Sequence, residues 1–164
     1  MSFMGCRGGR LAAALVVTMT VAGSAPRAQP KPQKPPTVSV YKTATCGCCA
    51  KWVDHMRAQG FDVKVQDVDD IGRVKATHGV PPEVSSCHTT LVGGYVIEGH
   101  VPASALHRFL KEKPEAVGLA VRGMPVGSPG MEVPDTPPDE YDVILFAHTR
   151  RTYARFRGSA ELSR

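Results

Sequence analysis

Three cysteines lie within four positions of this 164-residue chain, at Cys46, Cys48 and Cys49, where a predicted strand meets a predicted helix. Residues 38–41 (VSVY) alternate and are β-branched, which is typical of a strand. Residues 48–59 (CCAKWVDHMRAQ) place apolar side chains at helical spacing and are followed by a glycine, which predicts a helix and its end. The fold must therefore accommodate three thiols at the start of a helix that directly follows a strand.

The segments after this helix alternate between predicted strands and helices. Strict alternation over residues 61–68 (FDVKVQDV) predicts a second strand, and Gly93-Gly94 between two apolar runs predicts a hairpin. Residues 103–111 (ASALHRFLK) are amphipathic and follow a proline, which predicts a helix. With a short helix over residues 70–78, the predicted order is β-α-β-α-β-β-α. That is the order of a thioredoxin-like α/β fold.

The C-terminal part is expected to extend this fold. Residues 118–131 (GLAVRGMPVGSPGM) are rich in glycine and proline, which predicts a loop. Residues 141–147 and 152–157 contain short apolar runs that predict a terminal hairpin. We therefore expect a thioredoxin-like α/β fold with a C-terminal loop and β-hairpin extension.

The N-terminal segment has the features of a cleaved signal peptide. Residues 11–23 (LAAALVVTMTVAG) are apolar and follow Arg7 and Arg10, and small residues suitable for cleavage come next. The run is too short for a comfortable transmembrane helix, so no stable membrane insertion is expected after cleavage. The expected organisation is a signal peptide over 1–28, a Pro/Lys linker over 29–36, a metal-binding domain over 37–157 and a flexible tail over 158–164.

Export would place the chain in an oxidising compartment, so its cysteines would be disulfide-bonded, metal-bound or kept reduced by a dedicated system. Cys6 would leave with the signal peptide. Removing Arg7, Arg10 and Arg27 from a chain with a formal net charge of +5 leaves +2, and many of the remaining arginines lie near the C-terminus. This distribution does not indicate a nucleic-acid partner.

A fourth cysteine is expected beside the first three. In a thioredoxin-like order, the loop that enters the third strand lies next to the N-terminus of the first helix. That loop is residues 85–89 (SSCHT), and it contains Cys87. Four soft donors are therefore predicted to meet, although about forty residues separate Cys87 from the other three cysteines.

Three kinds of chemistry are open to these thiols. Cys46 and Cys49 form a C-x-x-C pair of the kind that exchanges disulfides, but Cys48 inside the pair would compete for the same partners. Four thiolates including Cys87 can hold one zinc ion, although three of them from one helical turn would crowd a tetrahedral site. Thiolates also suit Cu(I), and bridging several copper ions relieves the crowding.

Histidines and methionines provide further candidate ligands. His88 is adjacent to Cys87, but strand alternation would turn one of these side chains away from the other. Met124 and Met131 lie in the glycine- and proline-rich loop and are either ligands or ordinary apolar contacts. His55 is as well explained by a structural hydrogen bond as by ligation, and His100 is better explained as the end of the hairpin.

Three segments resemble one bacterial family: CGCCAKWVDHM, GVPPEVSSCHTTLVGGYVIEGHVPA and GLAVRGMPVGSPGM. The family was first described as a domain of unknown function and includes the CopG-type periplasmic copper-resistance proteins. The resemblance covers roughly residues 38–156. It implies a thioredoxin-like fold and a copper cluster bridged by cysteines, and it carries the loop methionine onto Met124, with Met131 as the second. Arg122 replaces a proline common in the family, which concerns the stiffness of the loop more than ligation.

The sequence therefore predicts a periplasmic copper-binding protein rather than a classical enzyme. Its expected cargo is Cu(I), with Cu(II) if the site undergoes redox exchange, and its expected partners are metal ions and other periplasmic copper-handling proteins. A thioredoxin-like thiol–disulfide oxidoreductase and a single-zinc structural module are the alternatives. The expected metal ligands are Cys46, Cys48, Cys49, Cys87, Met124, His88 and Met131.

Overall fold

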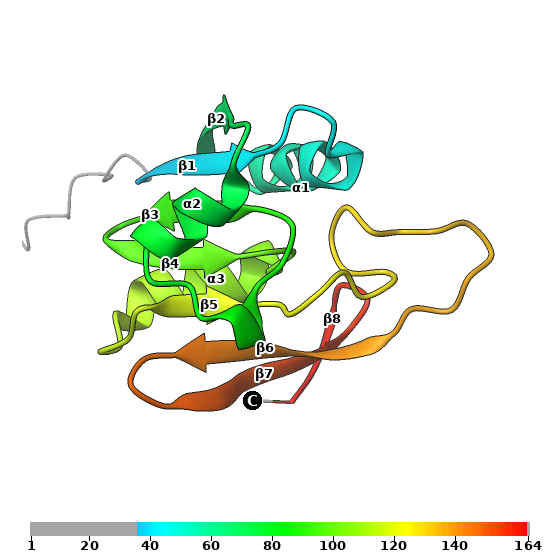
Figure 1. The fold of residues 1–164 in the computed structure, drawn as a ribbon. Coiled ribbons are helices and arrows are strands. Elements are labelled where there is room, and N and C mark those ends of the chain that lie inside the picture. The colour runs from blue at the N-terminus through cyan, green and yellow to red at the C-terminus, as the bar shows by residue number, and fades with distance from the viewer. Residues whose placement is uncertain (1–35, 164) are drawn as a thin grey trace, which may run out of the picture. The chain divides into compact units, whose positions relative to one another are not determined.

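A mixed eight-stranded sheet is the frame of residues 36–163, the part of the chain that the computed structural model describes (Figure 1). The strand order is β2-β1-β3-β4-β5-β6-β7-β8. The expected signal peptide and nearly all of the expected linker lie outside the described residues. Among the described residues, no helix is long and apolar enough to cross a membrane.

The first four strands lie side by side and confirm the elements expected from hydrophobic alternation. β1 pairs in parallel with β2 and antiparallel with β3, and β3 pairs antiparallel with β4. Gly93 and Gly94 form the turn between β3 and β4 with φ angles of 59° and 86°, a left-handed conformation that favours glycine. The strands are β1 (Thr37–Lys42), β2 (Asp62–Asp67), β3 (Thr89–Val92) and β4 (Tyr95–Glu98).

Helices connect these strands where the sequence predicts them. In the first helix, Trp52, Val53 and Met56 are buried because they recur on one face. The side chain of Asp70 caps the second helix by accepting a hydrogen bond of 2.9 Å from the backbone N–H of Arg73. The expected helices are α1 (Gly47–Ala58), α2 (Ile71–Thr77) and α3 (Ala103–Glu112). The structure adds a short 3-10 helix that was not predicted, η1 (Pro82–Val84).

The C-terminal part continues the same sheet, and here one prediction was wrong. The first residues of the expected loop over 118–131 form β5 (Gly118–Ala120), which pairs in parallel with β4. A Cβ atom at Gly118 would lie 1.6 Å from the backbone oxygen of Val96, so only glycine permits this approach. The segment is too short and too glycine-rich to show strand alternation in the sequence, and its pairing partner decides its conformation.

The predicted terminal hairpin is present and is followed by one more strand. β6 (Glu140–Phe146) pairs antiparallel with β5 and with β7 (Arg150–Arg157). Within the segment expected as a flexible tail, β8 (Ala160–Ser163) pairs with β7. All four residues of β8 are exposed, so they lack the apolar alternation by which the other strands were predicted.

Both faces of the sheet are covered. The larger apolar cluster contains Ile97 and Leu119 and packs against buried side chains of α1 and α3. A smaller cluster contains the neighbours of these residues, Val96 and Ala120, together with Phe146. Because adjacent residues of a strand point to opposite faces, the two clusters lie on opposite sides of the sheet. Trp52 of α1, which belongs to the larger cluster, lies against His88 in the loop before β3, with ring centroids 4.5 Å apart.

Candidate metal centre

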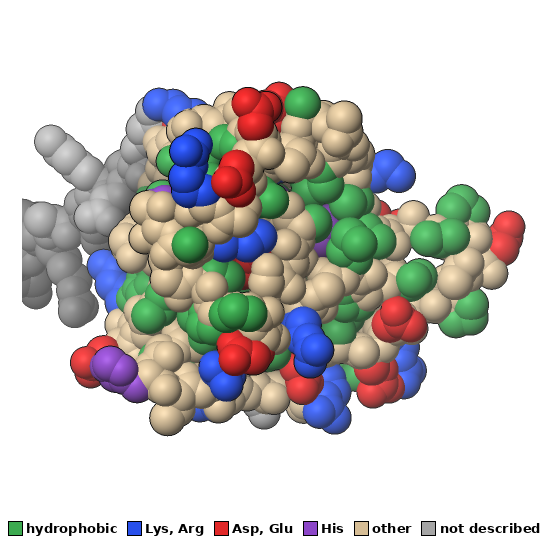
Figure 2. Space-filling model, viewed as in Figure 1, with side chains coloured by type: hydrophobic (Ala, Val, Ile, Leu, Met, Phe, Trp, Pro, Cys, Tyr) green, Lys and Arg blue, Asp and Glu red, His purple; other side chains and the backbone are tan. Residues whose placement is uncertain are grey.

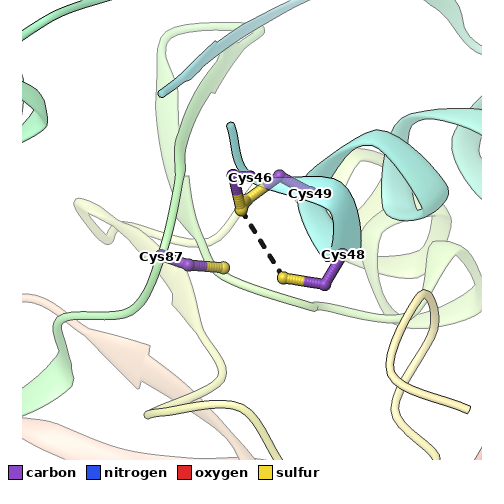
Figure 3. Close-up of side chains that lie close together, drawn as sticks. All are labelled: Cys46, Cys48, Cys49 and Cys87. Carbon is purple, nitrogen blue, oxygen red and sulfur yellow. Dashed lines mark hydrogen bonds between the residues drawn. A yellow bond between two sulfur atoms is a disulfide. The ribbon is translucent and has the colours of Figure 1, made fainter. Parts of the chain in front are cut away.

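The C-x-C-C motif lies where β1 leads into α1. Cys46 is the N-cap residue of α1 in an extended conformation, and Cys48 and Cys49 lie in its first turn. Cys46 and Cys49 form a disulfide with a Cα–Cα distance of 5.4 Å (Figure 3). Cys48 remains free, with its Sγ atom 3.5 Å from that of Cys46. The helix start thus places two bonded sulfurs and one free sulfur together.

Cys87 joins this group from the loop between η1 and β3, as the predicted order of elements requires. The Sγ atoms of Cys46, Cys48, Cys49 and Cys87 all lie within 4.8 Å of one another. Cys87 is free and partly exposed, and its side chain points toward the motif in Figure 3. The prediction that four thiols converge is confirmed.

A buried carboxylate holds the loop that carries Cys87. Glu98 at the end of β4 is fully buried, and its Oε1 accepts a hydrogen bond of 2.7 Å from the backbone N–H of Ser86. Its Oε2 accepts a hydrogen bond of 2.8 Å from the hydroxyl of Thr89, and Lys75 of α2 forms an ion pair with Oε1. Cys87 therefore lies between two residues that one carboxylate fixes.

Two buried imidazoles contact Cys87 on its other side. Its Sγ lies 3.0 Å from Nε2 of His100 and 3.3 Å from Nδ1 of His88. Nδ1 of His100 lies 2.8 Å from the backbone oxygen of Pro129, and because a carbonyl only accepts, that nitrogen carries the proton. The unprotonated Nε2 of neutral His100 therefore faces the sulfur, which is the tautomer that ligates metals.

Burial sets the protonation states of these three groups. Burial, and then the charge of the neighbouring Cys48, raise the pKa of the Cys87 thiol to about 12. Burial lowers the pKa of His88 and of His100, and for His88 the positive charges of His100 and Lys75 act in the same direction. At neutral pH the imidazoles are neutral and the thiol is protonated, so a metal ion must displace the Cys87 proton to bind there.

His88 and His100 differ from what the sequence alone suggested. His88 contacts Cys87 because both residues precede β3, so strand alternation does not apply to them. His100, expected merely to end the hairpin, lies against Cys87 as well. The hairpin register could have revealed this: Thr89 pairs with Glu98, and two residues outward on each side come Cys87 and His100.

The other candidate ligands lie farther from the sulfur cluster or have separate contacts. Nε2 of His55 accepts a hydrogen bond of 3.4 Å from the backbone N–H of Ala103, which agrees with the structural role considered for it. Met131 lines an open groove together with Cys48. Met124 is 54% exposed.

The segment between β5 and β6 passes beside α1 and projects from the body of the molecule (Figures 1 and 2). Within this segment, Gly130 packs against the backbone of α1, with φ at +86°. A Cβ atom there would lie 2.7 Å from the backbone nitrogen of Trp52 and 2.8 Å from the backbone oxygen of Cys48. The groove beside Cys48 therefore depends on glycine at this position.

Gly130→Ala is expected to destabilise the protein more than the matched change Gly123→Ala. Gly123 also has a positive φ, +67°, but an added Cβ would meet nothing within 4 Å. Both changes strain the backbone by about 1–2 kcal/mol, and only Gly130→Ala adds about 1–3 kcal/mol of overpacking against backbone atoms. Urea unfolding of the two variants measures the difference, and equal losses of stability would contradict the close packing of this segment on α1.

Comparison with known proteins agrees with the geometry of the site. The family described as "Protein of unknown function, DUF411" matches residues 84–131, which include Cys87, His88 and His100. Two solved structures, copper resistance protein CopG in Form 1 and Form 2, are 41% identical to this chain with a TM-score of 0.70. They cover 76% and 74% of this chain, which in turn covers 99% and 98% of theirs.

No curated protein matches the chain. The similarity to the two solved structures nevertheless extends over almost their whole length at substantial identity. The chain therefore belongs to the family of CopG-type copper-resistance proteins.

Proposed function

We propose that this protein binds Cu(I) in the periplasm through Cys46, Cys48, Cys49 and Cys87 and so handles excess copper. The observation that carries the proposal is the convergence of four sulfur atoms within 4.8 Å of one another. Soft thiolate ligands favour Cu(I) over harder ions. The solved relatives named as copper resistance proteins support the same cargo.

Bridging of several copper ions suits this arrangement better than a single zinc ion. Three of the four sulfurs come from the N-cap and first turn of α1, which limits how far they can spread around one tetrahedral ion. Sulfurs that bridge neighbouring copper ions do not need to surround one centre. His88, Met131 and Met124 are proposed as additional ligands that complete the copper shell, and Met124 would require the segment that carries it to move.

The disulfide indicates how copper binding and redox chemistry are coupled. Closing the Cys46–Cys49 bond releases two protons and two electrons from the two thiols. Two Cu(II) ions accept these electrons and become two Cu(I) ions, so the step balances. Reopening the disulfide with an external dithiol restores all four thiols, which we propose as the copper-binding state.

The proposed arrangement of the fold is thioredoxin-like. The order β2-β1-β3-β4, with β2 parallel to β1 and the C-x-x-C pair at the start of α1, supports this assignment. Copper would be received from and passed to other periplasmic copper-handling proteins. The partly exposed Cys48, beside an open groove, is where such an exchange would begin.

Thiol–disulfide exchange is the second candidate function, and the Cys46–Cys49 disulfide favours it. An exchanger turns over a disulfide substrate with these two cysteines and has no need of Cys48 or Cys87. To measure this activity, an external dithiol first reduces the Cys46–Cys49 pair, and the reduced protein is then tested for its ability to reduce a model disulfide. Two results together would favour this function over copper binding. The Cys48→Ser variant would still turn over the disulfide substrate, and the parent chain would not load copper.

Metal counting tests the proposed function directly. The full chain carrying Cys6→Ser is reduced under anaerobic conditions, loaded with Cu(I) and freed of unbound metal. Native mass spectrometry is expected to show at least two Cu(I) ions per chain, because the thiolates bridge. Fewer than two Cu(I) ions per chain would overturn the proposal, and one tightly bound Zn²⁺ with no Cu(I) beyond a single ion would support the zinc alternative.

A further inference from the structure

We propose that the disulfide form of this protein binds one divalent ion of borderline softness, such as Zn²⁺ or Co²⁺, through Cys87, His88 and His100. This site shares Cys87 with the four-sulfur set and His88 with the ligands proposed to complete the copper shell, and His100 belongs to this site alone. The inference rests on the proposed function only in those two shared residues. Oxidation of the Cys46–Cys49 pair would then change which metal the protein prefers.

The disulfide removes two of the four sulfurs from metal binding. Sulfur atoms joined to each other are no longer thiolates, and the thiolate is the form that binds metals. Cys87 stays free in this state, and its sulfur already contacts both imidazoles. The oxidised chain therefore retains the Cys87 thiol with two neutral imidazoles, and the free thiol of Cys48 lies within 4.8 Å of the Cys87 sulfur.

The spacing of these donors fits one ion. The ligand atoms of Cys87, His88 and His100 lie within 4.8 Å of one another, and the two measured sulfur–nitrogen distances are 3.0 Å and 3.3 Å. Bonds of about 2.3 Å to sulfur and 2.0–2.1 Å to nitrogen around a tetrahedral zinc place ligands at similar separations. Only small movements are needed to admit an ion, and Cys87 is partly exposed.

The surroundings support ligation by the two imidazoles. The hydrogen bond from Nδ1 of His100 to the oxygen of Pro129 orients the ring and leaves Nε2 free to bind, which is the usual support of a metal-binding histidine. His88 is fully buried, and its Nε2 has no hydrogen-bond partner among the described residues. The ring nitrogen that faces the sulfur is Nδ1, so His88 would ligate through Nδ1 and carry its proton on Nε2.

Donor chemistry distinguishes the two sites. One thiolate and two imidazoles suit zinc and other borderline divalent ions, whereas a cluster of thiolates suits Cu(I). The first set needs no change at the Cys46–Cys49 disulfide, and the second needs it open. The oxidation state of one cysteine pair therefore selects between a soft and a borderline metal site.

Cobalt binding by the oxidised protein tests the inference. The full chain with Cys6→Ser is oxidised until two thiols remain by thiol titration, and Co²⁺ is added. We expect about one Co²⁺ per chain, with a sulfur-to-cobalt charge-transfer band and the strong visible bands of tetrahedral cobalt. Absence of Co²⁺ binding by this oxidised protein would overturn the inference.

Matched variants separate this site from the copper site. His100→Ala is expected to weaken Co²⁺ binding by at least about 100-fold while the reduced chain still loads at least two Cu(I) ions. Cys48→Ser is expected to leave Co²⁺ binding by the oxidised chain unchanged and to lower the Cu(I) loading of the reduced chain to at most one ion. His107→Ala, a histidine of α3 stacked on Phe61, is the control that changes neither.

Folding of each variant is checked by circular dichroism. If His100→Ala does not fold, Cys87→Ser in the oxidised chain provides the second reading, because loss of the sulfur must remove the charge-transfer band. Cobalt binding that survives Cys87→Ser, or that is lost in Cys48→Ser, would contradict the assignment of these ligands. Failure of Cu(I) loading with intact Co²⁺ binding would count against the proposed function alone.

Discussion

Cys48→Ser is expected to retain the Cys46–Cys49 disulfide on oxidation and to lose bridged copper on reduction. The Cys48 sulfur is free and lies 3.5 Å from that of Cys46 and within 4.8 Å of that of Cys87, so we expect a bridging arrangement to depend on it. The disulfide does not involve Cys48 and should form as before. Copper should fall from at least two Cu(I) ions per chain to at most one, measured by native mass spectrometry beside a thiol count.

The same variant discriminates between the two proposed functions. A disulfide exchanger would work as well or better without Cys48, because the competing thiol is gone. Cys6→Ser is the matched control, since it replaces a cysteine outside the described residues and should leave copper loading unchanged. Copper loading that remains at two or more ions in Cys48→Ser would show that this residue does not bridge.

Glu98→Ala is expected to lower the free energy of unfolding by about 3–5 kcal/mol. Glu98 is fully buried and its partner Lys75 is only 11% exposed, so removal of the carboxylate leaves a nearly buried ammonium unpaired. The backbone N–H of Ser86 and the hydroxyl of Thr89 also lose their acceptor. Urea unfolding measures the loss of stability.

Asp54→Ala is the matched control for this prediction, because it removes an ion pair with Arg57 in which both side chains are largely exposed. A loss within about 0.5 kcal/mol is expected there. In Glu98→Ala the loop with Cys87 should also loosen, which lowers Cu(I) loading in the fraction that remains folded. A loss of stability no larger than that of the control would mean that Glu98 does not anchor this loop.

Periodicity in the sequence was sufficient for most of the fold. Along β1, buried and partly exposed residues alternate, as expected of a strand with one face against the core. The buried residues of α1 and α3 lie on one side of each helix. β5 and β8 were not predicted because a strand of three residues and a wholly exposed strand have no such pattern. Their pairing partners in the sheet decide their conformation.

The candidate site divides in the same way. The residues of the C-x-C-C motif are adjacent in the chain, so the sequence alone determined that three sulfurs would lie together at the start of a helix. The order of the elements was enough to predict that Cys87 joins them. The convergence of the four cysteines can be predicted from residue type and spacing, because it depends only on local geometry and on a recognisable order of strands and helices.

Only the tertiary structure decided which other side chains reach the sulfurs and which sulfurs are bonded. The sequence shows His100 as the end of a hairpin and Met124 as a loop methionine, yet the imidazole contacts Cys87 and the methionine is exposed. The disulfide between Cys46 and Cys49 is likewise one choice among several that the motif allows. Loop anchoring by Glu98 and burial set these distances, and such long-range packing leaves no periodic trace in the sequence.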